Sequence, residues 1–298
     1  MTKRALLLFL AVGVVWGIPY FFIAIATTEF STPSIVWLRV TFGAIALLPI
    51  VLRRGKLKLA LKNWRWVLLF AVVEMVGPWW LITEAERSVP SSLAGLFMST
   101  IPIVAALITG VFFGDRSAFH PLTIAGLVIG FTGVFSLVGI DVANGHLELS
   151  AIVMLLISAL CYATAPIVVN RTIPQIPGLE VSAVSLAMVS IIYLPFAIFT
   201  LPADLEAGTT LSGWSAVLVL GLFASALAFF LFFKLIDEVG PRRATIITYI
   251  NLVVATILGV ALLNEPITSG MLVGFPLIVV GSYLAGRERL PYVRKKNR

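Results

Sequence analysis

The sequence predicts an all-α integral membrane protein in which ten transmembrane helices form two inverted five-helix repeats around a central cavity. Three observations carry this prediction: the composition, the lengths of the apolar segments and a similarity between the two halves. Of the 298 residues, 60% are hydrophobic and only 12% are charged, and the mean hydropathy is +1.06. Soluble domains contain about 25% charged residues, so this chain has too much apolar surface for a soluble fold and must face lipid.

Ten apolar segments are long enough to cross a bilayer, which takes roughly 20 residues per helix. The connections between them are short, and most contain turn or helix-breaking residues. The alternating pattern typical of a membrane β-barrel is absent from the sequence. The predicted helices cover residues 5–25, 34–52, 65–83, 90–113, 121–139, 149–169, 180–200, 213–234, 243–263 and 268–286.

The two halves of the chain resemble each other. Residues 89–115 align without a gap with residues 239–265, at an offset of 150, and each stretch is apolar and ends in an acid, Asp115 or Glu265. A chance match between two apolar helices is the alternative explanation. The matching lengths and the acidic ends favour a true repeat, which in a membrane chain is typical of a transporter with a shared central site.

We therefore assign residues 1–140 to the first five-helix repeat, residues 149–286 to the second, and residues 287–298 to a basic cytoplasmic tail. The fifth and tenth helices are rich in glycine, and small residues let membrane helices approach closely. We expect close packing there. The glycines concerned are Gly126, Gly130, Gly133, Gly274 and Gly281.

Lysine and arginine predict the orientation, because they concentrate in cytoplasmic loops. With a cytoplasmic N-terminus and ten crossings, 19 of the 21 Lys and Arg residues lie on the cytoplasmic side. Arg87 lies outside and Arg39 lies within a helix. This topology explains the excess of positive charge without a nucleic-acid partner, and it places both termini in the cytoplasm. Five crossings per repeat is an odd number, so the second repeat is inverted, as alternating access requires.

Prolines within four predicted helices indicate helix breaks, because proline cannot donate a hydrogen bond to the carbonyl four residues earlier. Such breaks in a membrane protein face protein or water. We therefore expect the first, third, fourth, sixth, eighth and ninth helices to line the cavity. The four helix-breaking residues are Pro19, Pro78, Pro102 and Pro166.

Two charged residues lie within predicted helices. Glu74 is about eight residues into the third helix, where an ionised carboxylate costs roughly 3 kcal/mol. It is either a proton-coupling or cation-binding group, or a neutral acid satisfied by a neighbouring helix. Arg39 either extends its side chain to the outer interface or is a buried charge that pairs with an acid or a helix C-terminus and stabilises one conformation.

Aromatic and polar side chains near these positions are candidates for binding a small organic substrate. His120 and His146 have no Cys, Asp or Glu at metal-binding spacing, and a Walker A loop is absent from the sequence. We therefore expect no metal, no cofactor and no enzymatic activity. The predicted substrate-binding residues are Trp16, Tyr20, Glu74, Trp79, Met98, Tyr162, Tyr249 and Asn251.

Several motifs resemble the drug/metabolite transporter superfamily, specifically its EamA-type ten-helix members, over about residues 5–286. The resemblance implies a bacterial inner membrane, a basket-shaped cavity between the halves and a structural role for Arg39. Glu74 departs from the pattern, in which a small or amide side chain is more common. The motifs are Trp16-Gly17, Trp37-Leu38-Arg39-Val40, residues 85–94, Pro102, Asp115, Asn264-Glu265-Pro266, Gly274 and Gly281.

From these observations we expect a secondary active transporter, a monomer or weak dimer, that moves an amino acid or related metabolite by alternating access. The resemblance favours export and leaves the substrate open. The alternative within transport is a proton-coupled multidrug or cation exporter that uses Glu74. A membrane-embedded enzyme acting on lipid intermediates would need a polar cluster at one interface, which the sequence lacks, and a channel is a further alternative.

Overall fold

The computed structural model describes residues 2–114, 120–143, 148–239 and 247–286. These residues form helices joined by short loops, and strands are absent from this part of the chain. Eight helical segments are long and apolar enough to cross a membrane, and two shorter apolar helices complete the set. The prediction of ten membrane helices is therefore confirmed. Asp115 and the basic tail at 287–298 lie outside the described residues.

Several of the ten spans consist of two or three consecutive helices. The span Lys3–Ala26 contains α1 and α2, Ser91–Phe112 contains α7 and α8, and two others contain a π-helical segment. In chain order the helices are α1 (Lys3–Gly17), α2 (Pro19–Ala26), α3 (Thr32–Arg54), α4 (Leu57–Lys62), α5 (Trp64–Ala71), η1 (Val72–Val76), α6 (Gly77–Ala85), α7 (Ser91–Met98), α8 (Ile101–Phe113), α9 (Pro121–Ala143), α10 (Leu149–Thr172), α11 (Gly178–Ala207), α12 (Leu211–Gly221), η3 (Leu222–Leu227), α13 (Ala228–Val239), α15 (Ile247–Leu262) and α16 (Ser269–Gly286).

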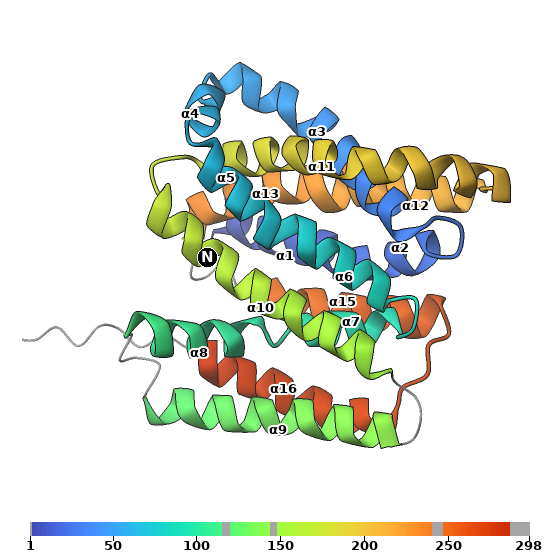
Figure 1. The fold of residues 1–298 in the computed structure, drawn as a ribbon. Helices are drawn as coiled ribbons and strands as arrows, with labels where there is room; N and C mark the ends of the chain where they lie inside the picture. Colours follow the sequence, from blue (N-terminus) through green and yellow to red (C-terminus); the bar gives the residue numbers. More distant parts are fainter. Residues whose placement is uncertain (1, 115–119, 144–147, 240–246, 287–298) are drawn as a thin grey trace, which may run out of the picture.

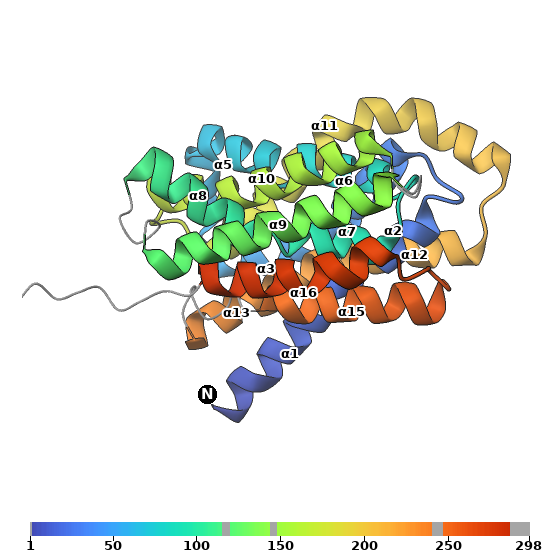
Figure 2. The same ribbon diagram turned by 90° about the horizontal axis from the view of Figure 1, so that it is seen from below.

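The helices lie side by side and run roughly along one common direction (Figure 1). The most extensive packing joins one helix from each half of the chain: α9 with α16, α3 with α11, α6 with α10, and α1 with α15. Seen from below, α9 and α16 lie next to each other across the middle of the molecule (Figure 2). The two halves thus form one bundle, because each half covers the apolar faces of the other.

A π-helical segment occurs at the same place in each half. The segments η1 and η3 begin at residues 72 and 222, a separation of 150 that equals the offset found in the sequence. In η1, the following Pro78 cannot donate to the carbonyl of Glu74. In η3, the Ser225 hydroxyl donates to the Leu220 carbonyl at 2.9 Å. Because π-helical turns often mark functional sites, both segments direct attention to the residues around them.

The glycines of α9 and α16 allow the backbones of these helices to touch. A methyl group on Gly126 would lie 2.5 Å from the backbone nitrogen of Ala285 and 2.7 Å from the carbonyl oxygen of Gly281. A methyl group on Gly274 would lie 2.8 Å from the carbonyl oxygen of Gly133. The expected close approach of the glycine-rich helices is therefore found, and it pairs the last helix of each repeat.

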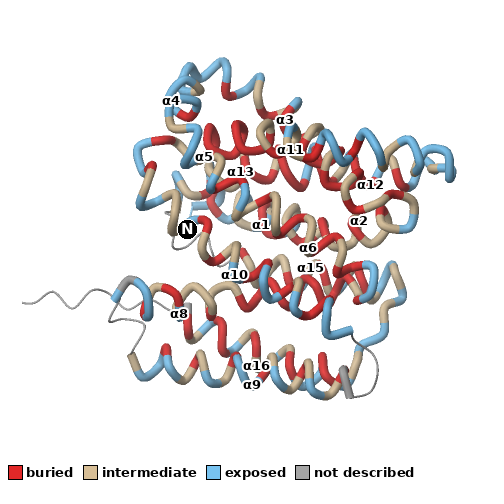
Figure 3. The backbone as a smooth tube through the Cα atoms, in the orientation of Figure 1, coloured by how far each residue is buried: buried red, intermediate tan, exposed pale blue. Residues whose placement is uncertain are grey.

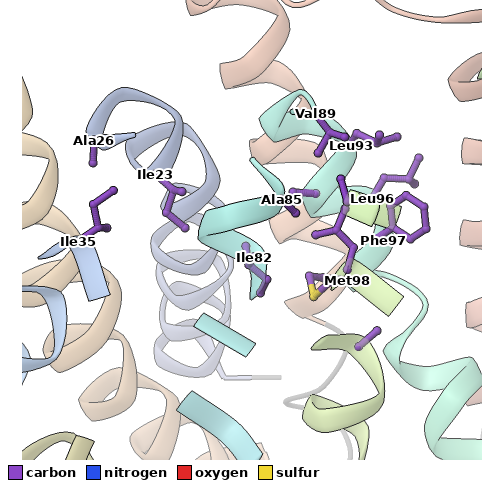
Figure 4. Close-up of a cluster of buried hydrophobic side chains, with 14 of the residues drawn as sticks. Ile23, Ala26, Ile35, Ile82, Ala85, Val89, Leu93, Leu96, Phe97 and Met98 are labelled. Atoms are coloured by element: carbon purple, nitrogen blue, oxygen red, sulfur yellow. The ribbon is translucent and has the colours of Figure 1, made fainter. Parts of the chain in front are cut away.

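Buried residues follow the inner faces of the helices, whereas exposed residues face outward (Figure 3). Many exposed residues are large and apolar, as expected where lipid is the solvent. One buried cluster lies where α2, α6 and α7 meet, with Ile82, Leu93 and Phe97 among its members (Figure 4). Met98 belongs to the same cluster and is 3% exposed.

The contact between α9 and α16 predicts that Gly126→Ala destabilises the protein. The added methyl group would collide with backbone atoms, which cannot rotate away, and overpacking of this kind costs about 1–3 kcal/mol. Thermal unfolding in detergent should therefore occur at a lower temperature. The control is Gly139→Ala on the same helix, where the added carbon meets no atom within 4 Å. Equal unfolding temperatures for the two variants would contradict the described packing.

Candidate functional site

The guanidinium of Arg39 lies buried where the two halves meet. The residue is on α3 and is 7% exposed. Its Nε donates a hydrogen bond of 3.1 Å to the Ser225 hydroxyl in η3, and its Cζ lies 3.7 Å from the centroid of the Trp79 ring. Arg39 therefore does not extend to the membrane interface. Arg39 is buried, as the second interpretation expects, but its described contacts are one hydrogen bond and one cation–π contact, and it forms no ion pair with an acid among the described residues.

Two tyrosines adjoin this arginine. Tyr20 and Tyr162 both interact electrostatically with Arg39, and Trp79 lies near Tyr162. Both tyrosines lie deep among the helices, yet part of their surface remains uncovered. The structure thus brings together three of the predicted substrate-binding residues, and it adds Arg39 to them.

A buried carboxyl group, Glu86, completes this cluster and was not among the predicted site residues. Glu86 directly follows α6 and is 6% exposed. No described residue donates a hydrogen bond to either of its carboxyl oxygens. Burial raises the pKa of the Glu86 carboxyl well above its usual range, the nearby Glu265 raises it further, and Arg39 opposes both. We refer to Arg39, Tyr20, Trp79, Tyr162 and Glu86 as the Arg39 cluster.

The sequence carried one signal for Glu86. It lies within residues 85–94, the stretch that connects two helices and carries part of the family resemblance. Its position directly after an apolar span suggested a solvent-exposed loop. The next residue, Arg87, does point away from the cluster, and it donates to the carbonyl oxygens of Thr27 and Phe30 at 3.1 and 2.7 Å.

Glu74 lies in η1, in another part of the bundle interior. One of its carboxyl oxygens, Oε2, is buried and has no hydrogen-bond partner among the described residues. It interacts electrostatically with Cys161 and Tyr162 of α10. Tyr162 therefore links Glu74 to the Arg39 cluster, whereas no described charged residue is found to interact with Glu74 itself.

The remaining predicted binding residues lie elsewhere. Trp16 packs against Phe229 and Phe232 of α13, with ring centroids 5.9 and 4.5 Å away. Tyr249 lies against Tyr283 of α16 at 6.5 Å. These aromatic side chains contact other helices, and Met98 belongs to the apolar core.

Asn251 connects α15 to α1. The amide end of Asn251 lies 2.7 Å from the Gly13 carbonyl oxygen and 3.1 Å from the Ile247 carbonyl oxygen, so we assign the amide nitrogen, a donor, to this position. Both bonds satisfy backbone groups within the bundle. In this conformation Asn251 therefore supports the packing of the two halves.

Three of the four prolines coincide with breaks between helices. Pro19 begins α2 after the interruption at Ile18, Pro78 follows η1, and Pro102 lies at the start of α8. Pro166 does not break its helix, because α10 continues through it from Leu149 to Thr172. The structure therefore shows no interruption of the helix at Pro166, whose ring lies on an exposed face of α10.

Acidic side chains join the two halves at one end of the bundle, where α6 ends and α7 begins. The Glu265 carboxylate accepts hydrogen bonds from the backbone N–H groups of Ser91 and Ser92, at 2.7 and 2.9 Å. It thereby caps the N-terminus of α7, where a negative charge is favourable. We call this contact the Glu265 cap.

A second acid makes the reciprocal contact. Glu29, in the loop after α2, accepts hydrogen bonds from the backbone N–H and the hydroxyl of Thr210, at 2.7 and 2.6 Å. These bonds hold the pKa of the Glu29 carboxyl below its usual range. Thr210 immediately precedes α12, so each half of the chain caps a helix of the other at this end.

These features define a class of protein: a ten-helix membrane transporter built from two repeats. A model of the EamA-like transporter family matches residues 3–139 and 149–287. The chain therefore belongs to the EamA-like transporter family, whose members are transporters and not enzymes. A transporter acts in a lipid bilayer on a small-molecule substrate.

Curated relatives and solved structures agree with this assignment. The chain is 27% identical to a protein of Escherichia coli (strain K12) named "Uncharacterized inner membrane transporter YedA", over 92% of this chain and 90% of the relative. It is 23% identical to "Uncharacterized transporter YvbV" of Bacillus subtilis (strain 168), over 96% and 92% of the two chains. One solved crystal structure has the same fold, with a TM-score of 0.65, 19% identity, and coverage of 96% and 97%.

The Glu265 cap predicts that Glu265→Ala destabilises the protein by about 2 kcal/mol, because hydrogen bonds to a charged group contribute about 1.5–3 kcal/mol. The variant leaves two backbone donors at the start of α7 without their acceptor. Thermal unfolding in detergent provides the measurement, and Glu148→Ala is the control, because Glu148 is exposed and accepts only a 3.5 Å bond from Ser150. A Glu265 variant as stable as the Glu148 variant would argue against the cap.

Proposed function

We propose that this protein is a secondary active transporter that moves an amino acid or related small metabolite out of the cell across the inner membrane by alternating access. The observation that carries this proposal is the Arg39 cluster. It combines a buried cation, a buried acid and aromatic rings where the two repeats meet. Aromatic faces together with a few charged groups are suited to a small polar organic molecule.

The position of two tyrosines supports a binding site shared by the repeats. Tyr20 on α2 and Tyr162 on α10 come from different repeats, and both are half-buried and interact with Arg39. A substrate bound there would contact both repeats. Its binding would therefore depend on how the repeats are placed relative to each other, which is the property that alternating access requires.

The contacts at the end of the bundle support a two-state mechanism. With the cytoplasmic N-terminus that the charge distribution predicts, the Glu265 cap and the Glu29–Thr210 contact lie on the outer side. The described conformation is then the one closed toward the outside. Opening this end would break contacts between the repeats, and the inverted arrangement provides a second conformation of similar kind.

A binding screen followed by counterflow tests the proposal. Purified protein is melted in the presence of each of the twenty L-amino acids, and the ligand that raises the melting temperature most is taken forward, since binding to the native state stabilises it. In proteoliposomes, unlabelled ligand inside should accelerate the uptake of the labelled ligand outside. Absence of any thermal shift would contradict the substrate class, and flux without saturation or counterflow would indicate a channel.

The unpartnered oxygen of Glu74 favours one second candidate, a cation exporter that couples protons through Glu74. We expect Glu74→Gln to keep the pH dependence of amino-acid counterflow, because Glu74 lies outside the Arg39 cluster and forms no ion pair among the described residues. The measurement compares wild-type and variant proteoliposomes over a pH series, with tetraphenylphosphonium as the probe for cation export. Loss of the pH dependence together with loss of tetraphenylphosphonium export would support the second candidate instead.

A further inference from the structure

The Arg39 cluster contains one basic and one acidic residue, Arg39 and Glu86, and neither forms an ion pair with a described residue. Arg39 and Glu86 interact electrostatically, but within the described part of the chain they form no ion pair with each other. Tyr20 interacts with both of them. Trp79, whose ring lies 3.7 Å from the Arg39 guanidinium carbon, precedes Glu86 by seven residues, which is about two helical turns and places both on the same side of α6. The two charged groups therefore lie near each other without direct contact.

The guanidinium of Arg39 and the carboxyl group of Glu86 both have donors or acceptors that form no hydrogen bond with a described residue. Arg39 donates through Nε only, so its two terminal nitrogens have no described acceptor. Both oxygens of Glu86 lack a described donor. Buried polar groups in native proteins are nearly always satisfied, and unsatisfied ones need an explanation. A ligand that supplies one acceptor group and one donor group would satisfy both residues at once.

The charge balance limits what that ligand can be. An isolated anion would neutralise Arg39 and leave Glu86 as a buried neutral acid. An isolated cation would pair with Glu86 and be repelled by Arg39. A zwitterion places a carboxylate beside the guanidinium, which suits bidentate binding, and an ammonium beside the acid. With Glu86 ionised, the four charges cancel.

The surroundings of Glu86 indicate when it carries a proton. The charged or titratable groups that interact with it are Arg39 on α3, Glu265 after α15 and Tyr20 on α2. Burial and the charge of Glu265 both favour the neutral acid, and Arg39 alone favours the carboxylate. Glu265 is held in place by the α7 N-terminus, so in this conformation the neutral acid is favoured. An arriving ammonium would reverse that preference.

We propose that Arg39 and Glu86 form one binding site for a zwitterionic substrate, in which the substrate carboxylate binds Arg39 and its ammonium replaces the proton of Glu86. The proton leaves the carboxyl oxygen for water on the side to which the site is open, and no other bond changes. One proton is thereby exchanged for one substrate, so an inward proton gradient drives export. This inference rests on the proposed transport function and adds the two residues that recognise the charged groups of the substrate and the residue that couples transport to protons.

A ligand series tests the two halves of the site separately. The amino acid that stabilises the purified protein most is compared with its amide, which lacks the carboxylate, and with its N-acetyl derivative, which lacks the ammonium. Wild-type protein should bind each derivative about 30-fold or more weakly than the amino acid, as expected when one member of a buried charge pair is removed.

Matched substitutions distinguish a binding role from a structural role, because a residue that only stabilises the fold would change the binding of all three ligands equally. Arg39→Gln should weaken binding of the amino acid but not weaken binding of the amide any further. Glu86→Gln should behave in the same way toward the N-acetyl derivative. Equal losses for all three ligands would mean that the residues act on the fold alone and would overturn the assignment.

Proton release is the second measurement. Calorimetric titrations of the amino acid in mildly acidic buffers with different ionisation enthalpies count the protons released on binding. Wild-type protein should release about one proton, because the acid is neutral before the ligand arrives and ionised afterwards. Glu86→Gln should release none, and the control Glu84→Gln, which alters an acid that accepts from Thr32 instead, should release the wild-type number.

Each outcome bears on one of the two proposals. Proton release unchanged in Glu86→Gln, or full-strength binding of the amide or of the N-acetyl derivative, overturns the zwitterion site. If tetraphenylphosphonium or another compound without a carboxylate is bound and transported, the transport function stands and the zwitterion site falls. If Glu86→Gln does not fold, the wild-type ligand series and proton count still decide between these results.

Discussion

One constraint on the structure is the burial of the Arg39 guanidinium between two repeats that contact each other mainly through apolar surfaces, with polar contacts such as the Glu265 cap at one end. A buried charge is costly unless it is paired and hydrogen-bonded. Arg39 obtains only a hydroxyl from η3 and an aromatic face from α6. This partial satisfaction explains why the neighbouring residues are aromatic and acidic, and why a ligand that completes the pairing would be held at the junction of the repeats. Binding and the relative position of the repeats are coupled by that one side chain.

The two kinds of contact between repeats have different consequences for motion. Glycine contacts between α9 and α16 join backbones at van der Waals distance, so this pair is suited to move as a unit. The Glu265 cap and the Glu29–Thr210 contact consist of hydrogen bonds to helix N-termini, which water can replace when that end opens. Glu86 interacts electrostatically with both Glu265 of the cap and Arg39, so under the zwitterion proposal its protonation would respond both to opening of the cap and to substrate binding.

The fold followed from the sequence because its determinants are local. Apolar length predicted the ten spans, and the glycines predicted close packing of the fifth and tenth helices, although not that α9 and α16 pack against each other. The site was only partly predictable, because helix rotation and loop placement decide which side chains meet. Trp16 and Tyr249 turn toward other helices, and Pro166 lies on an outer face without breaking α10. Glu86 was missed because its burial comes from tertiary packing around the start of α7, which spacing along the chain does not reveal.

The most direct test is a structure determined with the best-binding amino acid present. We expect density at the Arg39 cluster, with the carboxylate of the ligand at hydrogen-bond distance from the terminal nitrogens of Arg39 and its ammonium within about 3 Å of a Glu86 oxygen. A ligand bound elsewhere, or bound between the repeats without contact to Arg39 and Glu86, would show that these two residues do not recognise the substrate.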